Sequence, residues 1–292
     1  MRITGVKTQG AFWFLAPYFF LFFIFFLLPA LTIIPMSFTR WNILSDPVFV
    51  GIENYLRMFE DKWFWKAVFN TFYYTILVTI QLVSLGLLLA ILLNQPLKGR
   101  VVGRVLIIMP FVISSAAAGV VWKWMYNQNF GIINSYLRQL SLPTMGFLTD
   151  VNQAMPSLVF MNAWWSVGFN TIIFLAALQG IPEELYQAAK VDGANGWQIF
   201  RHITVPLLRP IILYATVLCA ANSFQMFDEA YMMTQGGPVG STVTLVYKTY
   251  NTAFEAFRFG DAAALSVVTM TFILIMTFFQ FRFSGRESFE SL

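Results

Sequence analysis

The sequence contains few charged residues: Asp, Glu, Lys and Arg make up 11% of its 292 residues, whereas they account for roughly a quarter of an average soluble domain. It also contains one cysteine, Cys219, and one histidine, His202. This excludes an internal disulfide and gives no basis for a metal site or a catalytic cluster of His and Cys. The shortage of charge excludes a water-soluble globular fold, because such a fold needs a charged surface over its core. We therefore expect most of the protein surface to face lipid.

Long apolar stretches dominate the rest of the sequence. Apolar residues make up 58% of the chain, and phenylalanine alone occurs 32 times. A membrane-spanning helix needs about 20 predominantly apolar residues. Uncharged stretches of this length predict six spans, at about 12–35, 68–93, 103–125, 154–179, 208–229 and 262–282. The predicted fold is an all-α integral membrane protein with six transmembrane helices in one domain, residues 1–292.

A further uncharged window, residues 230–247, differs from these spans. It contains Gly236-Gly237-Pro238 and then Gly240. These residues would break a helix and leave backbone groups unsatisfied in lipid. We interpret this window as an extramembrane or re-entrant loop.

Basic residues are denser on one predicted side of the membrane. That side holds both termini, because the number of spans is even, together with the loops near 94–102 and 180–207. It is shorter in total than the opposite side, yet it carries more of the Lys and Arg residues. The positive-inside rule therefore predicts that both termini are cytoplasmic. The first span is longer than a signal-peptide core and precedes no small-residue cleavage site, so we expect it to be retained.

The cytoplasmic segment 181–206 is too long for a simple connector. Pro182 followed by Glu183 and Glu184 is typical of a helix start. Gly193 predicts the end of this helix or a bend in it. Apolar residues then lead into the fifth span, so the segment is predicted to be an amphipathic helix–turn–helix at the cytoplasmic surface. From the residues alone, it either docks another protein or rests on lipid headgroups.

This segment also resembles a known family. Gln187-Ala188-Ala189, then Gly193, then Ile203-Thr204-Val205-Pro206 is similar to the EAA loop of ABC importer permeases, and its context is that of the carbohydrate-uptake subfamily. Other stretches fit the same subfamily in order along the chain: Met109-Pro110-Phe111, residues 126–134, residues 234–238 and residues 259–266. Two positions depart from the pattern, because Gln187 replaces the signature Glu and Val205 replaces Leu.

The resemblance implies the type I importer permease fold and a transport function without catalysis in this chain. The chain would be one of two transmembrane subunits in a bacterial or archaeal cytoplasmic membrane. A dimeric cytoplasmic ATPase would use ATP and Mg, and an extracytoplasmic binding protein would deliver a carbohydrate. No Walker-type phosphate loop occurs in this sequence, and the resemblance implies no cofactor and no nucleic acid for this chain.

The resemblance further implies a coupling helix at about 183–199 that docks on the ATPase. Its residues would be Glu183, Glu184, Gln187, Ala188, Ala189, Asp192 and Gly193. The small residues would give close approach, Asp192 would cap or bond within the turn, and the two glutamates would face basic residues.

Polar residues inside spans are costly and are therefore candidates for function. The spacing of the family landmarks suggests a translocation cavity lined by Phe111, Ser115, Trp165, Ser166, Phe169, Asn222, Ser223 and Met226. Trp165 and Phe169 share a helix face and are placed to stack on one sugar. Alternatively, span serines bond their own helix backbone, and aromatic residues pack at the bilayer interface.

Charge on the cavity candidates also bears on the substrate. They include no Lys or Arg, which argues against a phosphorylated substrate. Asp228 and Glu229 lie near the predicted outer end of the fifth span, where solvation is expected, although a proton or cation site is an alternative.

Two other classes of protein are compatible with six spans. A secondary transporter or channel would favour buried charges along its pathway and internal repeats, and neither is evident. A membrane enzyme would need a catalytic cluster that this composition does not supply. The sequence does not specify the sugar, the partner subunits or which permease makes more of the substrate contacts.

Overall fold

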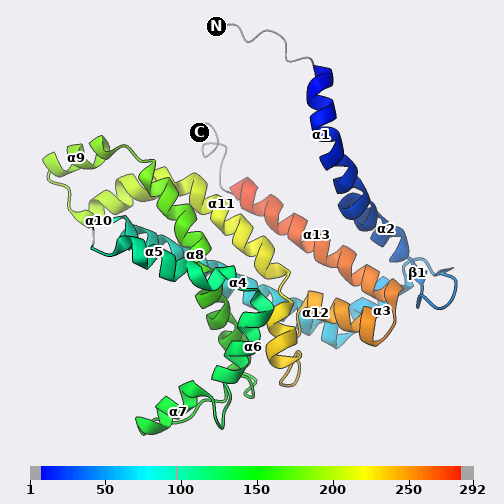
Figure 1. Cartoon of the computed structure of the whole chain (residues 1–292). Helices are drawn as coiled ribbons and strands as arrows, with labels where there is room; N and C mark the ends of the chain where they lie inside the picture. The colour runs from blue at the N-terminus through cyan, green and yellow to red at the C-terminus, as the bar shows by residue number, and fades with distance from the viewer. Residues whose placement is uncertain (1–7, 97, 284–292) are drawn as a thin grey trace. The chain divides into compact units, whose positions relative to one another are not determined.

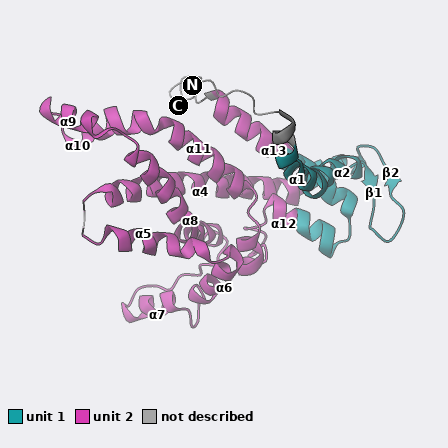
Figure 2. Ribbon diagram, turned by 45° about the horizontal axis from the view of Figure 1, so that its top comes forward, with its two compact units in different colours: residues 1–61, 249–270 teal, residues 62–248, 271–292 magenta. Residues whose placement is uncertain are grey.

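The computed structural model describes residues 8–96 and 98–283, with side chains from residue 13 to residue 282. The termini, whose side of the membrane was predicted above, lie outside these residues. The chain divides into two compact units, residues 1–61 with 249–270 and residues 62–248 with 271–292 (Figure 2). Each unit is described separately below.

The first unit begins with a long apolar helical segment. This segment is continuous and consists of α1 (Thr8–Phe22), a π-helical turn (Phe23–Leu27) and α2 (Leu28–Met36). A short antiparallel hairpin follows, in which β1 (Thr39–Arg40) pairs with β2 (Val48–Phe49). The other elements of this unit are α3 (Glu53–Glu60), a π-helical turn (Asn251–Glu255) and the first part of α13 (Phe259–Phe283).

Ion pairs connect α3 to the start of α13 within the first unit. Arg57 contacts Glu53 at 2.9 Å and Asp261 at 3.0 Å, and Arg258 contacts Asp261 at 3.0 Å. Asn54 is buried and its Nδ2 donates to the carbonyl oxygens of Ser37 at 2.8 Å and Thr39 at 2.9 Å. The hairpin region, α3 and α13 are therefore held together by polar contacts.

The second unit contains the other helices among the described residues, shown in Figure 1. They are α4 (Lys62–Asn94), α5 (Arg100–Ile108), α6 (Ser115–Met125), α7 (Ile132–Gln139), α8 (Ala154–Gln179), α9 (Glu183–Val191), α10 (Gly196–Ile199) and α11 (Val205–Phe224), with α12 (Leu245–Tyr250) running to its edge. Short 3₁₀ or π-helical turns cover Met109–Val112, Phe200–Thr204 and Ala230–Thr234.

Long helices α4, α8 and α11 form the core of the second unit. Tyr74 and Val78 of α4 are almost fully buried in one apolar cluster with Leu158 and Met161 of α8. A second cluster places Phe174 of α8 with residues of α4 and α11. In a membrane, lipid offers no hydrophobic drive between helices, so close packing of this kind holds the bundle together.

Hydropathy and length confirm the all-α membrane class. Among the described residues, five helices are long and apolar enough to cross a membrane, and a sixth span is counted if one bent helix pair is taken together. The predicted fourth span, 154–179, coincides with α8. The helix of the predicted second span, α4, begins earlier than predicted, at Lys62, because it also includes Lys62 and Lys66.

Two predicted spans have a different form in the structure. The third is not one helix from 103 to 125, because Arg100–Val112 and Ser115–Met125 are bent by 97° at a break. Pro110 removes a backbone donor just before this break. The predicted fifth span, 208–229, corresponds to an apolar helix over Gly196–Phe224. Asp228 and Glu229 therefore lie beyond its end. The window 230–247 contains a π-helical turn, a loop and the start of α12, and it is not a span, as predicted.

Candidate functional site

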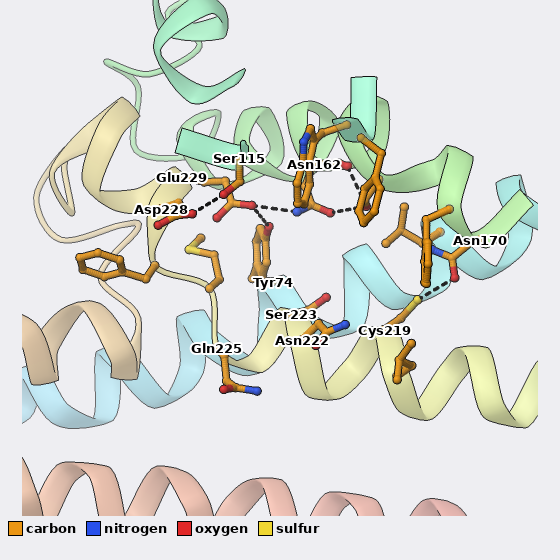
Figure 3. A pocket seen from close by; sticks show the side chains of 18 residues that line it. Tyr74, Ser115, Asn162, Asn170, Cys219, Asn222, Ser223, Gln225, Asp228 and Glu229 are labelled. Carbon is orange, nitrogen blue, oxygen red and sulfur yellow. Dashed lines mark hydrogen bonds between the residues drawn. The ribbon is translucent and has the colours of Figure 1, made fainter. Parts of the chain in front are cut away.

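A cavity of about 400 Å³ lies within the second unit, among α4, α8, α11, the broken third span and the segment after α11 (Figure 3). The structure brings all the predicted cavity residues together on its wall: Phe111, Ser115, Trp165, Ser166, Phe169, Asn222, Ser223 and Met226. It adds residues that the sequence analysis did not select: Tyr74, Leu82, Asn162, Asn170, Leu218, Cys219, Gln225, Phe227, Asp228 and Glu229. Substrate contact by any of them remains a prediction.

Three aromatic rings form one side of this cavity. The ring centroid of Phe111 lies 5.1 Å from that of Trp165 and 5.1 Å from that of Phe169. The Phe111 and Phe169 rings are stacked, with 23° between their planes. Phe169 is 37% exposed, so part of its ring remains open. These rings make an apolar surface of the kind on which a sugar ring stacks.

The break in the third span positions two of the cavity residues. Phe111 lies in the 3₁₀ turn before the break, and Ser115 is the first residue of α6 after it. Within the break, the carbonyl oxygen of Ile113 accepts a hydrogen bond from Trp165 Nε1 at 2.9 Å. Ser114 caps α6 by accepting from the backbone N–H of Ala117. Non-helical backbone at membrane depth needs partners of this kind, so the break is a stabilised part of the site.

A buried carboxylate also lies on the cavity wall. Glu229 is 5% exposed, and its Oε1 accepts hydrogen bonds from Asn162 Nδ2 at 2.8 Å and from the hydroxyl of Tyr74 at 3.3 Å. The hydroxyl of Ser115 donates to the neighbouring Asp228. Because Glu229 lies beyond the end of α11, its burial is due to packing of the following turn, and this burial raises the pKa of its carboxyl group from its ordinary value.

The remaining polar side chains of the cavity wall differ in their exposure and in whether they already form a hydrogen bond within the protein. Ser166 donates to the carbonyl oxygen of Asn162 at 3.0 Å, so it bonds its own helix. Cys219 Sγ donates to Asn170 Oδ1 at 3.1 Å. Asn222 is exposed to the cavity side, whereas Ser223 and Met226 are buried. Met226 belongs to the apolar cluster of the core.

The predicted coupling segment forms two short helices separated by a turn. α9 begins after Pro182 with Glu183 and Glu184 in its first turn and ends with Lys190 in its last, an arrangement that suits the helix dipole. Gly193 then adopts φ +79°, a left-handed conformation that favours glycine. The extent 183–199 is therefore divided at the glycine into α9 and α10.

Asp192 lies at the C-cap of α9, where its backbone N–H donates to the carbonyl oxygen of Ala188 at 3.0 Å, and a capping box begins α10. Asn195 Oδ1 accepts from the backbone N–H of Gln198 at 2.9 Å, and Gln198 Oε1 accepts from the backbone N–H of Asn195 at 2.8 Å. Gln187 Nε2 donates to Glu183 Oε1 at 3.4 Å, so the residue that departs from the signature bonds within its own helix. The coupling candidates are exposed, except Ala189, which is half-buried.

Comparison with known proteins identifies the family. A family model for the inner membrane component of binding-protein-dependent transport systems matches residues 82–288. The chain belongs to this family. The permease is 32% identical over 265 residues to the trehalose/maltose transport system permease protein MalF of Thermococcus litoralis, covering 86% of this chain and 89% of the relative. It is 33% identical over 283 residues to the arabinooligosaccharides transport system permease protein AraP of Bacillus subtilis, covering 96% and 90%.

A solved structure shares the fold of the permease. It is a bacterial alginate ABC transporter in complex with an alginate pentasaccharide-bound periplasmic protein. The TM-score is 0.86 at 22% identity, over 97% of this chain and 96% of that chain. The permease therefore has the predicted fold of the transmembrane subunits of type I ABC importers, and as a permease component it is not itself a catalyst.

Sequence reasoning about the permease missed Tyr74 and expected Asp228 and Glu229 to be solvated. Tyr74 and Glu229 are 155 positions apart and meet only because α4 packs beside the segment after α11. The early end of α11 is what brings both acids to the cavity wall. The sequence did contain a signal for the early end of this helix. In Gln225-Met226-Phe227-Asp228, two polar residues follow a long apolar run, which argues against a span that continues to residue 229.

Proposed function

We propose that this chain is a transmembrane subunit of an ATP-driven, binding-protein-dependent importer of a carbohydrate. The observation that carries the proposal is the cavity in the second unit, which combines three aromatic rings with hydroxyl, amide and carboxylate groups. Ligand sites of this type use apolar surface for affinity and a few polar groups for orientation. A sugar needs both, because its ring faces stack and its hydroxyls form hydrogen bonds.

The names of the relatives support a carbohydrate. Two permeases that cover most of this chain at 32% and 33% identity are named for trehalose or maltose and for arabinooligosaccharides. The solved transporter of the same fold is described with an alginate pentasaccharide on its periplasmic protein. We therefore infer that an extracytoplasmic binding protein delivers the sugar to this permease also.

The coupling segment supports an ATPase partner. α9, Gly193 and α10 present exposed small and acidic residues, with Ala188 and Gly193 open for close approach. We infer that this surface docks on a cytoplasmic ATPase dimer, which uses ATP and Mg, while a second permease completes the translocation path. Both termini would then be cytoplasmic, on the same side as this segment. Alternating access in the two permeases follows from closure of the ATPase dimer.

A matched pair of variants tests the substrate cavity. Phe169→Leu should lower ATP-driven uptake about tenfold, because it removes a stacking ring while keeping an apolar side chain. Phe160→Leu is the control, since Phe160 lies on the same helix, does not line this cavity and is 56% exposed. Uptake of labelled sugar into proteoliposomes containing the assembled transporter measures the effect.

The control should remain within about twofold of the wild type. Equal losses in both variants would contradict the assignment of the cavity. Uptake that persists without ATP but needs an ion gradient would instead support the alternative that this chain is a secondary transporter.

A further inference from the structure

The cavity wall is acidic. Asp228 and Glu229 are adjacent on it, and no Lys, Arg or His lines the cavity among the described residues. Charges act more strongly in a partly dehydrated cavity than in water, because the effective dielectric constant is lower. An anionic group entering this cavity therefore meets repulsion that no basic side chain offsets.

Most side-chain donors of the wall are already engaged. Asn162 and Tyr74 donate to Glu229, and Ser115 donates to Asp228. Trp165 Nε1 donates to the carbonyl oxygen of Ile113 at 2.9 Å. Figure 3 shows Ser115, Asn162 and Tyr74 turned toward the two carboxylates. The wall is thus richer in acceptors than in free donors.

A wall of acceptors favours a ligand that brings its own donors. Hydroxyl and ammonium groups donate to carboxylates, and bonds to a charged acceptor are stronger than neutral ones. A uronate or phosphate brings acceptors alone at its charged group and finds few donors. The solved alginate transporter shares only the fold at 22% identity, so the charge on its cargo does not decide the preference here.

We propose that Asp228 and Glu229 determine the charge specificity of this cavity, admitting uncharged or ammonium-bearing carbohydrates and excluding uronates and sugar phosphates. The inference rests on the proposed function and deepens it. Asp228 is half-buried and is the more accessible member of the pair, whereas Glu229 is fixed by Asn162 and Tyr74.

Binding measured without the binding protein tests this charge specificity. The assembled complex of permeases and ATPase is placed in nanodiscs, so that selection by the binding protein does not enter. The probes are a neutral trisaccharide, a trisaccharide of uronic acid and a trisaccharide of amino sugar. Saturation-transfer NMR titrations give a Kd for each. We expect the uronate to bind at least about tenfold more weakly than the neutral probe, and the amino sugar at least as tightly.

Two substitutions remove charge while keeping shape, Asp228→Asn and Glu229→Gln. In the double variant, the ratio of uronate to neutral Kd should fall to within about threefold. Glu60→Gln, an exposed carboxylate outside the cavity, is the control and should leave the ratio unchanged. Equal binding of uronate and neutral probe by the wild type, or an unchanged ratio in the double variant, overturns this inference alone. Absence of any sugar binding together with absence of ATP-driven uptake overturns the proposed function as well.

Discussion

We expect Gly193→Asp to abolish uptake, with a loss of about a hundredfold or more, while the permease stays in the membrane at its normal level. The reason is the position of Gly193 in the turn after α9, where the proposed ATPase would approach the backbone closely. Among the described residues, and apart from its two chain neighbours, a Cβ at Gly193 meets no atom within 4 Å. The new carboxylate would therefore be buried without a partner only when the ATPase docks. Uptake and ATPase co-purification measure the loss, and immunoblotting of membranes measures the level.

Gly99→Asp is the matched control for this experiment. Gly99 adopts φ +83°, close to the φ +79° of Gly193, and in the part of the chain that the structure describes a Cβ there also meets nothing within 4 Å beyond its chain neighbours. The backbone cost of placing Asp in this conformation, roughly 1–2 kcal/mol, is therefore the same at both sites. Gly99 precedes α5 and lies outside the coupling segment. Its variant should transport within about twofold of the wild type. Normal transport by Gly193→Asp would show that the docking assignment is wrong.

The fold of this permease was predictable where hydropathy alone decides it. The uncharged run at 154–179 became α8 with the same bounds, because a span-length apolar stretch has one stable state in lipid. The 97° bend in the third span was not predictable from composition. The bend depends on Pro110 and on the hydrogen bond from Trp165 to the carbonyl oxygen of Ile113. Trp165 lies 52 positions from Ile113 in the sequence.

The candidate site was likewise predictable from the sequence only in part. Phe111, Trp165 and Phe169 could be selected from the resemblance, and spacing on one helix already placed two of them on one face. The carboxylate contacts could not be selected, since the bond between Tyr74 and Glu229 depends on how α4 packs against a distant turn. Charge at the end of an apolar run is ordinarily solvated, and only tertiary packing shows that Glu229 is 5% exposed.

Gly168→Ala should lower uptake about tenfold and destabilise the permease, because α8 and the broken third span touch through backbone at this position. A Cβ on Gly168 would lie 2.7 Å from the carbonyl carbon of Ile107 and 2.8 Å from the Cα of Ile108. Real Cβ atoms do not approach backbone so closely, and backbone cannot rotate away as a side chain can. The end of α5 must then shift, and with it Phe111, whose ring centroid lies 5.1 Å from that of Phe169. The thermal midpoint of the detergent-solubilised protein and proteoliposome uptake measure the two effects.

Gly119→Ala is the control for Gly168→Ala. It also adds a methyl group to a helical glycine, but at a position without close contact to backbone. A Cβ at Gly119 of α6 would lie 3.4 Å from Met232 Cβ and 3.5 Å from Met233 Cγ, which are ordinary contacts with side chains. This variant should keep uptake within about twofold of the wild type, since alanine is the better helix former by roughly 1 kcal/mol. If Gly168→Ala also keeps full uptake and an unchanged midpoint, then α5 adapts without moving Phe111. The stacked pair of Phe111 and Phe169 would then not depend on the close approach of the two helices.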